Sequence, residues 1–255
     1  MSSPGIGGID EAYGDFLESA ATDDNVVGVV LSGSRGARTF VTDASDFDVF
    51  VIVRRLDDRW RYVYAAPVEM VPLTIEEFET YGLPGGHDAW NRPAFLFARV
   101  EIDRLDGAIE RIVERKRRLT PGEAQLIASE SLDDYINALY RSLKNLEAGR
   151  DLEGRLDAIE SLSPLLTTAF ALDGRVRPFN KWLRHDLGRE PLTMDGLLPR
   201  VERIARDSGT DEQRAMFRDI ERHARASGHD AGIDSWEPNV AWLRGEDGPD
   251  LPPLP

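Results

Sequence analysis

Residues 26–53 read VVGVVLSGSRGARTFVTDASDFDVFVIV and combine two apolar runs with a small polar segment between them. The first run, 26–31, is rich in valine, which is typical of a buried strand. The second run, 46–53, is also β-branched and aromatic, but two aspartates stand at its start. Gly33 and Ser34 follow the first run almost directly, so we expect a turn there. The sequence therefore predicts two strands joined by a polar connection.

Asp46 and Asp48 are two residues apart on the second predicted strand. Because side chains alternate along a strand, both carboxylates point to one face, which Phe50 and Ile52 continue. Two carboxylates this close repel each other unless a cation lies between them. Mg²⁺ takes oxygen ligands of this kind, usually together with substrate phosphates. The pair thus predicts a magnesium site, with a solvated strand start as the alternative.

The glycine–serine turn adds a second feature with possible chemistry. At the end of a buried strand, backbone amides and a small hydroxyl can approach a phosphate closely. Arg35 and Arg38 come next in the sequence and would add charge-assisted contacts to such a phosphate. An ordinary turn without a ligand has the same composition, so Gly33 and Ser34 alone decide nothing.

The combination of the two features is more specific than either one. Gly-Ser ends a strand, eleven residues intervene, and Asp-hydrophobic-Asp-hydrophobic opens the next strand. This pattern resembles the signature of the DNA polymerase beta-like nucleotidyltransferase superfamily, and a predicted helix over residues 9–21 precedes it as that family requires. The resemblance implies that Gly33 and Ser34 bind nucleotide phosphates, that Asp46 and Asp48 bind divalent metal ions, and that a later strand supplies a third carboxylate.

Glu69 is the preferred third carboxylate. It is the only charged residue of the apolar run PVEMVPLT, and a charge within such a strand needs a compensating partner. A metal ion or a substrate hydroxyl would be such a partner, and Glu69 would then act as a base. Glu101 and Asp103, at the end of a fourth predicted strand, are the alternatives. Asp43 is expected to be only solvated.

The two halves of the chain differ in pattern. Strands are expected at 68–73 and 95–102, with a loop over 81–92, and no strand-like run follows Ile102. Helical periodicity predicts helices at 108–118, 121–146, 152–172, 178–183, 197–205 and 211–226. The predicted fold is α+β: a polymerase beta-like mixed sheet with helices over 1–110 as the catalytic domain, an all-α helical bundle over 111–245, and a disordered tail over 246–255.

A catalytic domain followed by helices resembles bacterial small-molecule nucleotidyltransferases, including aminoglycoside and lincosamide adenylyltransferases. The resemblance extends to 135–144 and 177–183. Arg141 and Lys144 share one helical face, and Lys181 lies near a helix start, so all three are candidates for nucleotide binding. Surface ion pairing is the alternative for Arg141 and Lys144. Trp90, Trp182 and His185 are expected to be structural, with a place in the lining of an acceptor pocket as the alternative.

Composition limits the partners. Lys plus Arg is 31 and Asp plus Glu is 46, which gives a net charge of −15 and disfavours long nucleic acid. There is no cysteine, so disulfides and thiolate catalysis are excluded. Neither a signal peptide nor a membrane span is expected, and a cytoplasmic location is the default. The sequence does not indicate the oligomeric state.

These features predict a Mg²⁺-dependent nucleotidyltransferase. It would transfer a nucleoside monophosphate, AMP from ATP by preference, to a hydroxyl of a small-molecule acceptor. The resemblance makes an aminoglycoside-like antibiotic one such acceptor, with drug resistance as the associated role. The alternatives are transfer to a protein or tRNA, as in toxin-type enzymes, and a nucleotide-binding module without catalysis.

Overall fold

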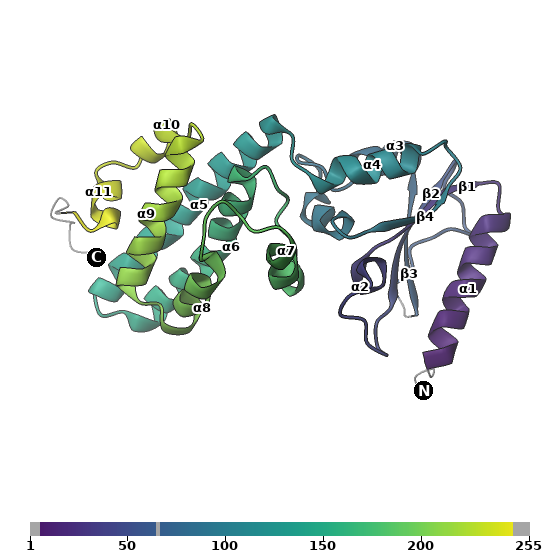
Figure 1. Ribbon diagram of the computed structural model, residues 1–255, viewed down its shortest axis with the longest axis horizontal. Helices are drawn as coiled ribbons and strands as arrows, with labels where there is room; N and C mark the ends of the chain where they lie inside the picture. The colour runs from purple at the N-terminus through teal and green to yellow at the C-terminus, as the bar shows by residue number, and fades with distance from the viewer. Residues whose placement is uncertain (1–5, 65–66, 247–255) are drawn as a thin grey trace. The chain divides into compact units, whose positions relative to one another are not determined.

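The computed structural model describes residues 6–64 and 67–246. The chain divides into two compact units between Arg118 and Leu119. The predicted boundary at residue 110 falls within helix α4 (Ala108–Arg117), which belongs entirely to the first unit (Figure 1). Residues 247–255, nearly the whole predicted disordered tail, lie outside the described residues.

A mixed four-stranded sheet forms the centre of the first unit. Its strands are β1 (Val26–Leu31), β2 (Phe47–Val53), β3 (Val68–Thr74) and β4 (Arg99–Asp103), in the order β3-β2-β1-β4. The central strand β1 is antiparallel to both β2 and β4, whereas β2 and β3 are parallel. The three valine-rich runs predicted as strands are therefore strands, and two of them lie side by side in parallel.

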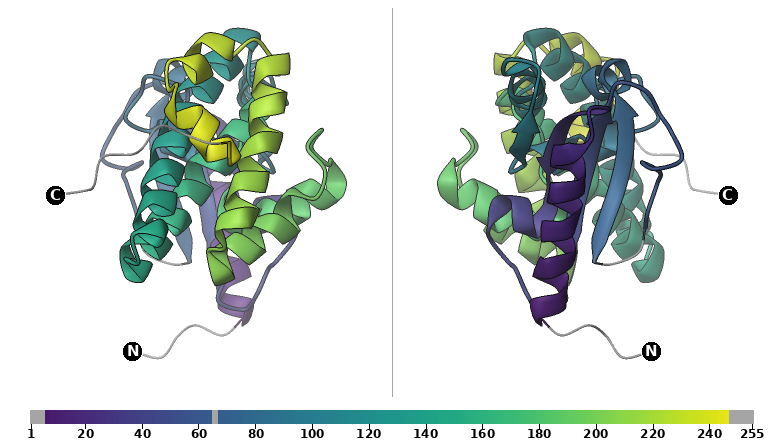
Figure 2. Two further views of the ribbon diagram at one scale, coloured as in Figure 1. Left: turned by 90° about the vertical axis from the view of Figure 1, so that its left-hand side faces the viewer. Right: turned by 90° about the vertical axis from the view of Figure 1, so that its right-hand side faces the viewer.

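Helices cover both faces of this sheet. Helix α1 (Ile6–Thr22) lies along one face (Figure 2), where Tyr13 packs with Phe47 and Val51. Helices α3 (Ile75–Thr80) and α4 cover the other face, where Phe78 and Val113 pack with Phe50. Alternate residues of β2 thus enter two separate apolar cores, as its period of two requires.

Several short elements differ from the sequence prediction. The expected turn at Gly33 is a five-residue helix, α2 (Gly33–Ala37), and the unpredicted helix α3 follows β3 directly. The last four residues of the expected 81–92 loop belong to a 3₁₀ helix, η1 (Ala89–Phe95), and β4 starts at Arg99 rather than at residue 95. Phe95 is fully buried against Phe50 and Phe78, which explains its apolar character without a strand.

The basic end of α4 is more buried than its sequence predicts. Lys116 is fully buried, and its Nζ donates hydrogen bonds to the carbonyl oxygens of Glu79 and Tyr81. Arg117 donates to the carbonyl oxygens of Phe95 and Ala98. A basic run that resembles a solvated helix face therefore cross-links α4 to neighbouring loops through backbone acceptors.

The described elements of the second unit are all helical. They are α5 (Pro121–Glu147), α6 (Asp151–Leu172), η2 (Asn180–Trp182), α7 (Leu183–Arg189), α8 (Leu197–Asp207), α9 (Thr210–Ala226), α10 (Asp230–Asp234) and α11 (Asn239–Arg244). The α+β class predicted for the chain is confirmed. Helices α10 and α11 were not predicted, and Pro178 precedes the helical turn at Asn180 instead of starting a helix.

The long helices α5 and α6 supply the core of the second unit. Thr120 caps α5 in a capping box with Glu123, as its sequence suits. Leu139 and Leu143 of α5 are fully buried with Phe170 of α6 and Phe217 of α9. Within the described part of the chain, no helix is both long and apolar enough to cross a membrane.

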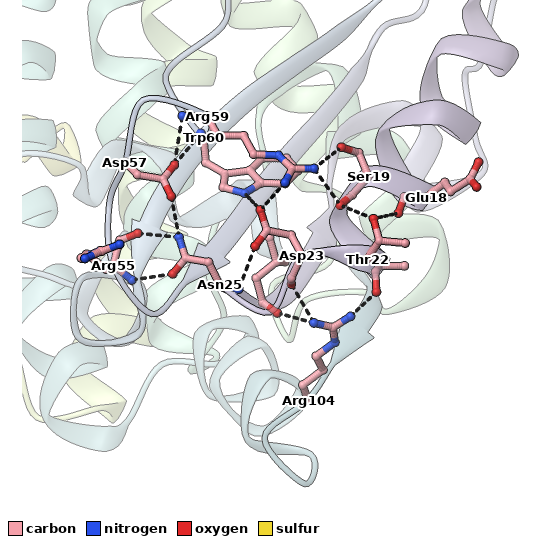
Figure 3. Close-up of polar contacts among 12 residues, drawn as sticks. Glu18, Ser19, Thr22, Asp23, Asn25, Arg55, Asp57, Arg59, Trp60 and Arg104 are labelled. Atoms are coloured by element: carbon pink, nitrogen blue, oxygen red, sulfur yellow. Dashed lines mark hydrogen bonds and ion pairs between the residues drawn. The ribbon is translucent and has the colours of Figure 1, made fainter.

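A polar network joins the end of α1 to the segment that follows β2 (Figure 3). Asp23 accepts hydrogen bonds from the backbone amide of Asn25 at 2.8 Å and from Trp60 Nε1 at 3.0 Å. Its carboxylate also pairs with Arg59 at 2.9 Å. These contacts, with the Asn25 amide contributing most, hold the pKa of Asp23 below its usual value. Trp60 is buried, so its indole N–H depends on this acceptor.

Substitution Asp23→Ala is expected to destabilise the first unit by about 1–3 kcal/mol, because it leaves the buried Trp60 N–H without an acceptor. Urea unfolding followed by tryptophan fluorescence measures this change. Asp24→Ala is the matched control, since Asp24 is an exposed neighbour with the same charge. Equal losses for the two variants would contradict the role assigned to Asp23.

His229 in the second unit predicts a pH dependence of stability. It is buried, and burial lowers its pKa below the usual 6.5. A lowered pKa means that the native state binds a proton less readily than the unfolded state, so stability is full above pH 6.5 and falls as the pH drops through the folded pKa. One proton changes the free energy of unfolding by at most about 1.4 kcal/mol per pH unit. Urea unfolding between pH 7.5 and 5 should show a steeper loss for the wild type than for His229→Gln; parallel curves would contradict this expectation.

Candidate active site

Three carboxylates converge at the edge of the sheet formed by β2 and β3. Asp48 on β2 is paired in register with Glu69 on the parallel strand β3. Side chains paired in this way lie on the same face, and Asp46 precedes β2 by one residue. Oxygen atoms from Asp46, Asp48 and Glu69 all lie within 4.8 Å of one another. The structure therefore brings together the three carboxylates selected from the sequence.

Helix α2 lies directly against this cluster. Gly33 has a φ of +62°, and a Cβ atom built on it would lie 2.0 Å from Asp48 Oδ2. Only glycine suits such a backbone conformation together with such a close approach. The preceding Ser32 donates its backbone amide to the carbonyl oxygen of Asp48 at 2.8 Å. The glycine of the Gly-Ser pair thus places the backbone of α2 beside the Asp48 carboxylate.

The donor set of the cluster fits a divalent cation. All three ligand groups are carboxylates, they are partly buried, and one oxygen of each lies close enough to share one ion. Hard cations such as Mg²⁺ prefer oxygen ligands and leave other positions for water or phosphate. Without a cation, three carboxylates at this separation repel one another. The donor atoms and their spacing therefore suit a bound metal ion.

The alternative third carboxylates have other partners. Glu101 pairs with Arg99 at 2.6 Å, and its charge acts on Tyr13 of α1, on the opposite face of the sheet. Asp103 accepts backbone hydrogen bonds from Leu105 at 2.9 Å and from Glu110 at 3.2 Å. Neither residue belongs to the acidic cluster, whose third carboxylate is that of Glu69.

The candidate phosphate-binding residues of the first unit separate into two groups. Ser34 is buried within α2, beside Gly33. Arg38 is exposed at the left-handed residue that ends this helix. Arg35, in contrast, pairs with Asp10 of α1 at 2.7 Å and stacks over the ring of Phe47. The Arg35 side chain therefore fastens α2 to the α1 face instead of joining the acidic cluster.

The other candidate residues lie in the second unit. Arg141 pairs with Glu160 at 2.9 Å and with Asp157 at 3.2 Å, so the ion-pair alternative is observed, with partners on α6. Lys144 Nζ lies 5.4 Å from the Tyr140 ring centroid, and Lys181 Nζ lies 5.4 Å from the Trp182 ring centroid. Their proposed part in nucleotide binding is not observed within this unit and stays a prediction.

A pocket of about 390 Å³ adjoins the acidic cluster. Asp48 and Glu69 belong to its lining. Aromatic, aliphatic and polar residues complete the lining: Val49, Phe50, Tyr62, Val63, Tyr64, Val71, Tyr81, His87, Asp88, Trp90 and Asn91. A molecule in this pocket could therefore contact Glu69 directly.

Sequence reasoning missed most of this pocket. Tyr62 and Tyr64 precede β3 in a segment without strand periodicity, which an isolated bridge between Val63 and Met70 holds against the sheet edge. Trp90 was expected to be structural, but it is 70% exposed and lines the pocket. Trp182 is buried at 6% exposure, as expected for a structural residue. The clustering of aromatic residues at 60–64 and 81–90 was the only available signal.

Fold and site together define an α+β protein with a carboxylate cluster suited to a metal ion at the rim of an aromatic pocket. Among solved structures, the chain is similar to a nucleotidyltransferase-like protein from Exiguobacterium sibiricum, with a TM-score of 0.47 and 15% sequence identity. The similarity covers 89% of this chain and 79% of that chain. The sequence matches no protein-family model and no curated protein.

Proposed function

We propose that this protein is a metal-dependent nucleotidyltransferase. It would transfer a nucleoside monophosphate, AMP from ATP by preference, to a hydroxyl group of a small-molecule acceptor. The observation that carries this proposal is the convergence of Asp46, Asp48 and Glu69 within 4.8 Å, with Gly33 pressed against Asp48. This is the arrangement that the spacing between Gly-Ser and the aspartates implied.

The carboxylates have separate roles in this proposal. Asp46 and Asp48 would hold Mg²⁺, whose bound charge offsets that of the triphosphate. Glu69 borders the pocket, so it is placed to orient an acceptor hydroxyl and to accept its proton. Gly33, Ser34 and the exposed Arg38 would contact the phosphates. Most of the rate would come from positioning and from charge stabilisation.

The acceptor is proposed to be small. The pocket of about 390 Å³ has room for a metabolite or part of an antibiotic, and an aminoglycoside-like acceptor is one member of this class. The net charge of −15 disfavours tRNA. It does not separate a small acceptor from a protein acceptor, so both belong in the assay.

Pyrophosphate release tests the proposal. Purified protein, Mg²⁺ and each of the four nucleoside triphosphates would be incubated with a panel of hydroxyl compounds, with aminoglycosides, and with a cell extract. We expect pyrophosphate to form only with Mg²⁺ and acceptor together, and with ATP above the other nucleotides. Labelling of a protein band would shift the proposal to the toxin-type alternative. Tight ATP binding without pyrophosphate release from any mixture would instead support a nucleotide-binding module.

A further inference from the structure

The pocket beside Glu69 is lined by five aromatic residues, Phe50, Tyr62, Tyr64, Tyr81 and Trp90, together with valines and polar side chains. Tyr62 and Tyr64 come from the segment at the β3 edge, and their ring centroids lie 5.7 Å apart in a stacked arrangement. Trp90 comes from η1, and Tyr81 follows α3. Asn91 Nδ2 donates to the Tyr81 hydroxyl at 2.9 Å, which fixes that ring. Three separate segments thus direct aromatic rings at one cavity.

Three of these rings are unusually exposed for their size. The exposed fractions are 51% for Tyr62, 75% for Tyr64 and 70% for Trp90. Large aromatic side chains normally bury most of their surface, because burial of their apolar area is favourable. Rings that stand exposed around a cavity therefore retain apolar surface that a ligand would cover.

The charge of this pocket is negative. Its lining includes Asp88, Asp48 and Glu69 but neither lysine nor arginine. Among residues 6–64 and 67–246, none forms an ion pair with Asp88. Burial raises the pKa of Tyr81, and the negative charge of Asp88 raises it further. Asp88 therefore acts on the Tyr81 ring, which lines the same cavity.

We propose that this pocket binds the alkylated ammonium group of the acceptor, so that the acceptor is a hydroxyl compound carrying a methylated ammonium. This inference rests on the proposed function for the identity of the ligand as acceptor. Asp88 would supply the opposite charge, and the rings of Tyr62, Tyr64 and Trp90 would supply cation–π attraction. The Glu69 carboxylate, which lines the same pocket, would receive the hydroxyl.

The lining favours an alkylated ammonium over other ligands. An anionic acceptor would meet Asp88 and Glu69, and, among the described residues, no lysine or arginine lines the pocket to balance them. A primary ammonium is strongly hydrated and gains little from contact with aromatic rings, which make up five of the residues that line this pocket. A methylated ammonium is weakly hydrated and is recognised by aromatic faces. The cavity and its charge therefore fit this group best.

Direct binding of three small probes tests the inference. Choline, ethanolamine and the neutral isostere 3,3-dimethyl-1-butanol would be titrated into the full chain without ATP or metal, with calorimetry or ligand-detected NMR as the readout. Choline is expected to bind about tenfold more tightly than either of the other probes, because only choline combines charge with methyl groups. The proposal would be overturned if either ethanolamine or 3,3-dimethyl-1-butanol bound as tightly as choline.

Matched variants assign the effect to the pocket. Asp88→Asn and Trp90→Leu should each weaken choline binding about five- to tenfold. The weak binding of the neutral 3,3-dimethyl-1-butanol should be the same in Asp88→Asn as in the wild type, because only a charge is removed. Asp58→Asn changes the net charge equally, but Asp58 is exposed outside the pocket, so choline affinity should not change. An equal loss in Asp58→Asn would contradict the assignment. Since these measurements need no nucleotide, they can succeed or fail independently of the pyrophosphate assay.

Discussion

Substitution Asp46→Asn is expected to lower nucleotidyl transfer by about 10³-fold, the scale on which loss of one charge-stabilising group acts. Asn keeps the shape of the side chain but removes the negative charge from a cluster that needs it to hold a cation. Calorimetric titration of ATP with and without Mg²⁺ should show a matching loss of metal-dependent ATP binding. Pyrophosphate release from ATP, with whichever acceptor supports it, measures the loss of turnover.

The fold should survive this change. Asp46 precedes β2 and is only partly buried, and removal of one of three neighbouring carboxylates relieves repulsion, so metal-free thermal stability should be equal or higher. Asp43→Asn is the matched control, because Asp43 is an exposed carboxylate of the same loop. Full turnover in Asp46→Asn, or an equal loss in Asp43→Asn, would refute the assigned site.

Substitution Gly33→Ala is expected to have the second largest effect. The new Cβ would lie 2.0 Å from Asp48 Oδ2, so either the carboxylate or the backbone of α2 must move. The positive φ of +62° adds about 1–2 kcal/mol of backbone strain. Either movement disrupts the contact between α2 and Asp48, so we expect metal-dependent ATP binding to weaken at least about tenfold. The melting temperature should also be lower.

Gly174→Ala separates the strain from the collision. Gly174 has a φ of +67°, close to that of Gly33, but nothing lies within 4 Å of its added Cβ. This variant should lose similar stability and keep full nucleotide and metal binding. If Gly174→Ala also lost ATP binding, or if Gly33→Ala kept it, the contact between Gly33 and Asp48 would not be part of the site.

The sequence predicted the strands and long helices, in which residue types follow a regular period. Strand alternation placed Asp48 and Phe50 on one face, and the charge of Glu69 within an apolar run marked it before any pairing was known. Short elements were less accessible, because a helix such as α10 has too few residues to show a period. The burial of Lys116 was also missed, since its partners are carbonyl oxygens that no residue pattern identifies.

The carboxylate cluster, which lies at two strands, was predicted from the sequence, whereas most of the pocket lining, which lies on loops, was missed. Parallel pairing of β2 with β3 sets the position of Glu69 opposite Asp48, and both strands were found. Tyr64 and Trp90 reach the pocket through long-range folding of the chain, so no local spacing connects them. The partnership of Arg35 with Asp10 was missed for the same reason: it joins residues that are distant in sequence.

The register between β2 and β3 makes the position of Glu69 independent of the connection that carries part of the pocket lining. Glu69 is held opposite Asp48 by main-chain pairing, so the length and composition of the connection between the strands do not move it. That connection carries Tyr62 and Tyr64. Replacement of this connection would therefore change the pocket lining and leave the carboxylate cluster in place.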